Sequence, residues 1–152
     1  MKKGLKIFLG IVVALLIIIV PIISSYNNLI SLEQKVLNAS SNIETQLQRR
    51  SDLIPNLVNV VKGYATHEED IFTQIAEARS KLAGANTVSE QVNADAELSS
   101  ALSRLLVVVE QYPDLKANEN FKDLSSQLTK VEDDIANARK YYNGTVRLFN
   151  DK

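Results

Sequence analysis

The stretch Ile7–Ile23, IFLGIVVALLIIIVPII, carries no charge and is almost wholly apolar. A helix that crosses a bilayer needs about 20 apolar residues, each rising about 1.5 Å. Leu5 and the seven uncharged residues from Ser24 to Ile30 extend the stretch to that length. We therefore expect an uncleaved transmembrane helix. The predicted division of the chain is a cytoplasmic stub with the span over residues 1–24 and a helical bundle domain over residues 25–152.

A cleaved secretory signal and a buried helix of a soluble protein are the alternatives for this stretch. The basic start of the chain fits a signal, and Ser24 or Ser25 is small enough to permit cleavage. However, the A-x-A pattern is absent and the apolar run is longer than the roughly 7 to 15 residues of a signal. The anchor is therefore the favoured interpretation.

Lysines flank the apolar stretch unevenly. Lys2, Lys3 and Lys6 precede it, whereas only Lys35 occurs in the first twenty residues after it. Positive charge near a span is typical of the cytoplasmic side. The bias favours a cytoplasmic N-terminus and a body outside the cell membrane. The reverse topology stays open, because a short N-terminal tail can also be translocated.

The composition excludes several functional classes. The chain has no cysteine and one histidine, His67, so disulfides, thiolate sites and multi-histidine metal sites are excluded. From Ser24 onward 14 basic and 18 acidic residues give a mildly acidic body without a basic stripe, which argues against nucleic-acid binding. His67-Glu68 begins like HExxH, but Ile71 stands where the second histidine is required. We predict no enzymatic activity, no catalytic or metal-ligating residue and no cofactor.

Apolar residues recur at helical spacing through the body, which predicts an all-α fold. The signals at the helix ends are two capping boxes, Thr66–Glu69 and Thr87–Glu90, together with Gly84 and Asn118. We expect helices at about 26–64, 67–83, 88–111 and 119–149, the first kinked at Pro55 and continuous with the span. A loop is predicted over Pro113–Asn118, and the last helix has a seam like that of a coiled coil. Together they form an elongated antiparallel four-helix bundle behind an N-terminal transmembrane helix.

The predicted helices differ in length. The first is about 57 Å long and the second only about 25 Å, at about 1.5 Å per residue. The second helix cannot cover the whole of the first, so the part from Tyr26 to Ile43 has fewer partners for its apolar stripe. This imbalance favours self-association or a protein partner near the membrane.

One arginine lies on the buried stripe of the first helix. Arg50 is in phase with Leu47, Ile54 and Leu57, and a buried guanidinium requires a carboxylate. We expect that carboxylate on the last helix, where the candidates are Glu132, Asp133 and Asp134. A structural ion pair that sets the helix register is favoured over ligand binding by the arginines. The three acidic residues point in different directions on one helix, so they predict no cation site.

Several motifs together resemble one known family. They are Tyr26-Asn27-Asn28-Leu29, Gln46-Leu47-Gln48-Arg49-Arg50, Asp52-Leu53-Ile54-Pro55-Asn56-Leu57-Val58, Val61-Lys62-Gly63-Tyr64-Ala65 with His67-Glu68, Tyr112-Pro113-Asp114-Leu115-Lys116-Ala117-Asn118, Asn120-Phe121, Ala138-Arg139 and Tyr142-Asn143. In these segments the chain closely resembles the LemA family of bacterial membrane proteins. The resemblance implies a single N-terminal membrane helix, a long helical bundle and no catalytic or binding residues to transfer. Family chains look longer at the C-terminus, so we expect this chain to be partial.

The resemblance and the helix order suggest one interaction patch and a function. We hypothesise that the kink in the first helix and the turn after the third meet in a polar and aromatic patch. Its candidate residues are Arg49, Arg50, Asp52, Pro55, Asn56, Lys62, Tyr64, Tyr112, Pro113 and Asp114. The expected function is a membrane-anchored scaffold for protein partners or self-assembly. The alternatives are an adaptor or regulator of a membrane peptidase, which the resemblance suggests, and a bundle that binds a small ligand or acts as an enzyme.

Overall fold

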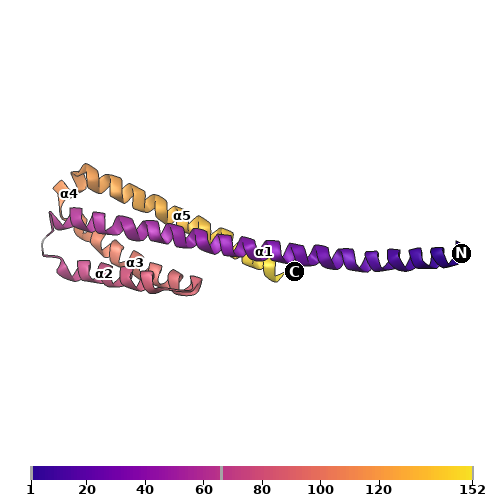
Figure 1. Ribbon diagram of the computed structural model, residues 1–152. Coiled ribbons are helices and arrows are strands. Elements are labelled where there is room, and N and C mark those ends of the chain that lie inside the picture. Colours follow the sequence, from indigo (N-terminus) through magenta and orange to yellow (C-terminus); the bar gives the residue numbers. More distant parts are fainter. Residues whose placement is uncertain (1, 66, 152) are drawn as a thin grey trace. The chain divides into compact units, whose positions relative to one another are not determined.

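The computed structural model describes residues 2–65 and 67–151, and these residues are helical apart from short turns (Figure 1). The helices are α1 (Lys2–Lys62), α2 (Glu69–Gly84), α3 (Val88–Val109), α4 (Pro113–Ala117) and α5 (Glu119–Asn150). No strand occurs among the described residues. The predicted all-α class is therefore confirmed.

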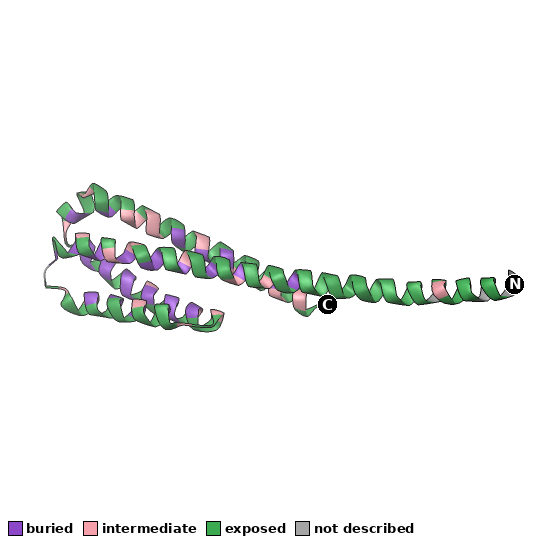
Figure 2. Ribbon diagram, in the orientation of Figure 1, coloured by how far each residue is buried: buried purple, intermediate pink, exposed green. Residues whose placement is uncertain are grey.

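Helix α1 joins the apolar stretch to the first helix of the body without a break. It continues through Pro55, as predicted, and ends at Lys62 rather than at residue 64. Its N-terminal part is long and apolar enough to cross a membrane, and none of that window is buried within the described structure. Figure 2 shows this part as almost uniformly exposed. Because the exposure of so much apolar surface to water is unfavourable, this segment supports a membrane location for the protein.

The contacts divide the chain into two compact units. One comprises the residues up to Ala39 together with those from Tyr141 onward, and the other comprises Ser40–Lys140. The predicted boundary between residues 24 and 25 lies inside α1, and that division of the chain stays a prediction.

The unit Ser40–Lys140 is the helical bundle. In it the end of α1, α2, α3 and the start of α5 run in alternating directions along the chain (Figure 1). Each contributes an apolar stripe at steps of three and four residues, which places one face inside. The side chains that are almost completely buried include Ile54, Leu57, Val61, Ile75, Leu98, Leu105 and Val131.

The two predicted capping boxes differ in outcome. At the start of α3 the Thr87 hydroxyl accepts from the Glu90 amide at 3.2 Å, and the Glu90 carboxylate accepts from the Thr87 amide at 3.0 Å, which confirms the box. Hydrogen bonds from the Asn86 amide and then from Thr87 lower the pKa of the Glu90 carboxyl. Thr66 of the other box lies outside the described residues. Helix α2 begins at Glu69 rather than at 67, and its N-cap Glu68 makes no capping hydrogen bond through its side chain.

The segment predicted as a loop after α3 contains a short helix, α4. The predicted loop is therefore wrong, because Pro113, with its fixed φ and missing N–H, suits the first position of a helix. Leu115 is fully buried and secures this turn against the bundle. Asn118 caps α5 as predicted, because its Oδ1 accepts from the Phe121 amide at 3.1 Å.

The other unit contains only two helices, α1 up to Ala39 and α5 from Tyr141. Leu32, Ala39 and Thr145 are buried in it, and the Thr145 hydroxyl donates to the carbonyl of Tyr141 at 2.9 Å. Other apolar side chains remain exposed, namely Tyr26, Leu29, Ile30, Leu37, Tyr141 and Leu148. Two helices have too few faces to enclose all of their apolar residues.

Candidate functional site

A buried ionic cluster joins three helices of the bundle. The Nη1 of Arg50 on α1 donates to the Oδ1 of Asp95 on α3 at 2.5 Å, and the Nη2 of Arg139 on α5 donates to the other oxygen, Oδ2, at 2.9 Å. The side chains of Arg50 and Asp95 are only 4% and 5% exposed. Asp95 therefore pairs with positive charges from two helices in a site with little water, where an unpaired charge is very costly.

The predicted carboxylates on α5 take secondary positions around this cluster. Glu132 Oε1 lies 3.8 Å from Arg50 Nη2, and Asp134 Oδ2 lies 4.0 Å from Arg49 Nη1. Asp133 is exposed. The principal partner of Arg50 is thus Asp95 of α3, which the sequence analysis did not name, and the predicted Glu132 of the last helix is a second and longer ion-pair partner.

Sequence reasoning missed Asp95, although the signal was present. Asp95 lies in phase with the buried residues Gln91, Leu98 and Leu102 of α3. A charged residue on a buried stripe requires a partner of opposite charge, which is the reasoning that singled out Arg50. When the buried stripes of two helices carry one such residue each, of opposite charge, the two residues are the expected partners of each other.

A second polar contact arises from Pro55. A helical proline lacks the N–H that would bond to the carbonyl four residues earlier, which here belongs to Ser51. Ser51 is buried, and Nε of Arg79 on α2 lies 3.0 Å from its carbonyl oxygen and 3.0 Å from its hydroxyl oxygen. Arg79 thus donates the hydrogen bond that Pro55 cannot give to this carbonyl. The carbonyl that lacks a partner within α1 is therefore bonded to α2.

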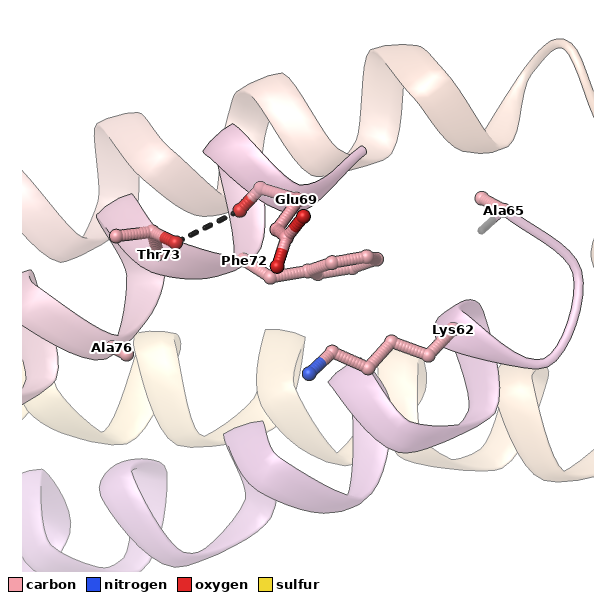
Figure 3. Close-up of a pocket in the computed structure, with 6 residues that line it drawn as sticks. All are labelled: Lys62, Ala65, Glu69, Phe72, Thr73 and Ala76. Carbon is pink, nitrogen blue, oxygen red and sulfur yellow. Dashed lines mark hydrogen bonds between the residues drawn. The ribbon is translucent and has the colours of Figure 1, made fainter. Parts of the chain in front are cut away.

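At the far end of α1 a groove of about 480 Å³ opens beside the start of α2. Figure 3 shows Lys62 reaching toward the ring of Phe72, with Nζ 5.0 Å from the ring centroid. Thr73 donates to the backbone carbonyl of Glu69 at 2.9 Å, so its hydroxyl is engaged within α2. The arrangement is a cation–π contact on an open surface.

Near this end Tyr64 lies close to α4. The Nδ2 of Asn118, which follows α4, donates to the Tyr64 hydroxyl at 3.1 Å. Tyr112 is the N-cap of α4, Pro113 is its first residue and Asp114 follows.

The ten residues of the predicted patch are spread along the bundle. Arg50 and Lys62 are about 18 Å apart along α1, at about 1.5 Å per residue. Arg49 and Arg50 belong with the ionic cluster, and Asp52 accepts from Gln48 at 2.8 Å on an exposed part of α1. Asn56 is exposed beside it. The hydrogen bonds and ion pairs of the described residues do not join Pro55 with Tyr112, so a single patch stays a prediction.

The described residues contain no group of three or more His, Asp or Glu side chains arranged to hold a metal ion. His67 lies exposed in the turn before α2. Chemically, the sites above are polar contacts between the bundle helices. The Arg50–Asp95–Arg139 cluster and the Ser51–Arg79 contact both require one particular alignment.

Comparison of the sequence with those of known proteins identifies several relatives of this chain. Magnetosome protein MamQ 1 of Paramagnetospirillum magneticum is 27% identical over 165 residues, which cover 91% of this chain and 61% of the relative. MamQ of Magnetospirillum gryphiswaldense is 26% identical with the same coverage. Protein LemA of Metamycoplasma hominis is 29% identical over 127 residues, which cover 83% of this chain and 58% of the relative. The chain spans about three fifths of the length of these curated relatives.

The family itself is shown by a match over most of the body. The model of the LemA family matches residues 39–152, which include the ionic cluster, the Pro55 contact and α2 to α5. The chain belongs to the LemA family.

Proposed function

We propose that this LemA-family chain is a membrane-anchored, non-enzymatic helical scaffold that binds protein partners or a second copy of itself. The observation that carries the proposal is the exposed apolar surface of the two-helix unit. Leu37 on α1 is 56% exposed, and Tyr141 and Leu148 on α5 are 59% and 60% exposed. These residues are not part of the apolar stretch Ile7–Ile23 that we assign to the membrane, so that assignment does not account for their exposure.

The buried charges of the bundle support a structural role. Asp95 is held by Arg50 and Arg139 on two other helices. A helical bundle that is tied to the membrane through its own chain can present surfaces to partners without a chemical step. The names of the relatives assign no reaction, and "magnetosome protein" describes those relatives only.

We propose a single-pass anchor with the N-terminus in the cytoplasm and the body outside, from the lysines that precede the apolar stretch. Protease added to intact cells tests this topology. Digestion of the body without permeabilisation supports it, and digestion only after permeabilisation reverses it.

Chemical crosslinking of the full chain in its own membranes tests the scaffold proposal. We expect discrete products of higher mass that contain the chain. A charge at Leu37, in Leu37→Glu, should remove them, because it would have to be desolvated in the contact. The matched control Asn38→Glu adds the same charge to a polar, exposed position of the same helix and should keep them. A chain that stays monomeric and uncrosslinked in every sample would contradict the proposal.

A further inference from the structure

We propose that a cavity among α1, α3 and α5 binds a small oxyanion, a phosphate or a carboxylate, through Arg50. The cavity has a volume of about 130 Å³ and lies within the Ser40–Lys140 unit. Its polar lining consists of Arg50, Ser99, Ser103, Ser125, Thr129 and Glu132. This inference does not rest on the scaffold proposal, since a scaffold without a ligand and one with a ligand would share the same surfaces.

Arg50 supplies the charge and the donors. Its side chain is 4% exposed and lines the cavity, and its Nη1 is engaged by Asp95. Its Nη2 lies 3.8 Å from Glu132, which is too far for a hydrogen bond. The guanidinium therefore keeps donors without a carboxylate at bonding distance in the described part of the chain. A guanidinium fork matches the paired oxygens of a carboxylate or phosphate.

Three of the hydroxyl groups that line the cavity differ in whether a hydrogen bond already uses them. Ser103 donates to the carbonyl of Ser99 at 2.9 Å, and Thr129 donates to the carbonyl of Ser125 at 3.0 Å, so these two protons are used within their own helices. The hydroxyl oxygen of Ser125 is buried, and among the described residues it has no hydrogen-bond partner. Ser125 and Arg50 both line this cavity, and the complement of a hydroxyl and a guanidinium is a hydrogen-bond acceptor.

Size and charge restrict the ligand further. A volume of about 130 Å³ is that of roughly four waters at ~30 Å³ each, and it lies below the ~300 Å³ of sites for drug-sized molecules. Phosphate and acetate have few enough atoms. Glu132 opposes an anion, but its side chain is 62% exposed and can turn toward solvent. Its charge then lowers the affinity without blocking the site.

Calorimetric titration of the detergent-solubilised full chain with inorganic phosphate, and separately with acetate, tests the inference at constant ionic strength in chloride. We expect saturable binding of at least one of the two anions, and the two titrations distinguish phosphate from carboxylate. Glu132→Gln should bind roughly tenfold more tightly, because a repelling charge a few ångströms away is removed and partly screened by solvent. A cation or an ammonium ligand would show the opposite change.

Two serine variants locate the site. Ser125→Val fills the cavity and should abolish binding, and Ser125→Ala removes only the hydroxyl and should weaken it several-fold. Ser100→Val on an exposed position of α3 is the matched control and should bind like the unaltered chain. Circular dichroism establishes that each variant is folded. The inference is overturned if neither anion binds to the unaltered chain or to Glu132→Gln, if Glu132→Gln weakens binding, or if folded Ser125→Val binds as before.

Discussion

Arg79→Met tests whether Arg79 supports the carbonyl that Pro55 leaves without a helical partner. In the unaltered chain this substitution removes the Nε–H that reaches the Ser51 carbonyl and hydroxyl oxygens, each at 3.0 Å. Ser51 is 7% exposed, so water reaches its carbonyl poorly. A buried acceptor left without a partner costs about 1 to 3 kcal/mol, and we expect a loss in that range.

Pro55→Ala supplies the comparison. Alanine restores an N–H at position 55, which can donate to the Ser51 carbonyl as in any α-helix. The carbonyl then has a partner whether or not Arg79 is present. In the Pro55→Ala background we therefore expect Arg79→Met to cost less than half as much, which corresponds to a coupling of about 1 kcal/mol between the two positions.

The unaltered chain, Arg79→Met, Pro55→Ala and the double variant are unfolded with urea in detergent. Circular dichroism at 222 nm then gives the free energy of unfolding of each. Arg104→Met is the matched control, because Arg104 also links two helices but donates to Gln74 on an exposed surface at 2.8 Å. Arg104→Met should lower the free energy of unfolding only slightly, and by the same amount with and without Pro55. If Arg79→Met costs the same with and without the proline, the assigned role of the proline is refuted.

Three further predictions concern the cluster, the cap of α3 and the core. Asp95→Leu should cost about 3 to 5 kcal/mol in urea unfolding, because it leaves a buried guanidinium unpaired. Arg50→Met should cost roughly half as much, since Asp95 keeps its second arginine; the reverse order would contradict the shared carboxylate. The pKa of Glu90 is lowered in the folded chain, so its stabilisation is complete above the unfolded value near 4.5 and is lost as pH falls through the folded value. Thermal melts from pH 6 to 3 should therefore show a shallower acid decline for Glu90→Gln, and parallel curves would argue against it. Leu98→Ala should lower stability by about 2 to 5 kcal/mol, because Leu98 is fully buried; a loss below about 1 kcal/mol would place it outside the core.

The sequence predicted most of the fold because helical periodicity and end signals act locally. Thr87 with Glu90, Gly84 and Asn118 mark helix ends within one turn of themselves, and the structure keeps all three. The short α4 was missed because five residues carry too little periodicity to distinguish a helical turn from a loop.

The polar contacts were harder to predict because their partners lie on other helices. Arg50 was recognised as a buried charge, but Asp95 is 45 residues away, and its helix had to be placed before the pair could be named. Likewise, Pro55 predicts that the Ser51 carbonyl lacks a helical partner. No signal in the neighbouring sequence, however, indicates that Arg79 of α2 donates to it.

The most direct test of the scaffold account is a photoreactive phenylalanine analogue in place of Leu37, irradiated in intact membranes. Leu37 is an apolar, 56% exposed residue beside the anchor, and Asn38 is its exposed polar neighbour on the same helix. The account predicts a discrete adduct, with a protein partner or a second copy, from position 37 and little or none from position 38. Absence of any adduct at position 37, or equal adducts at both positions, would contradict a specific contact through this surface.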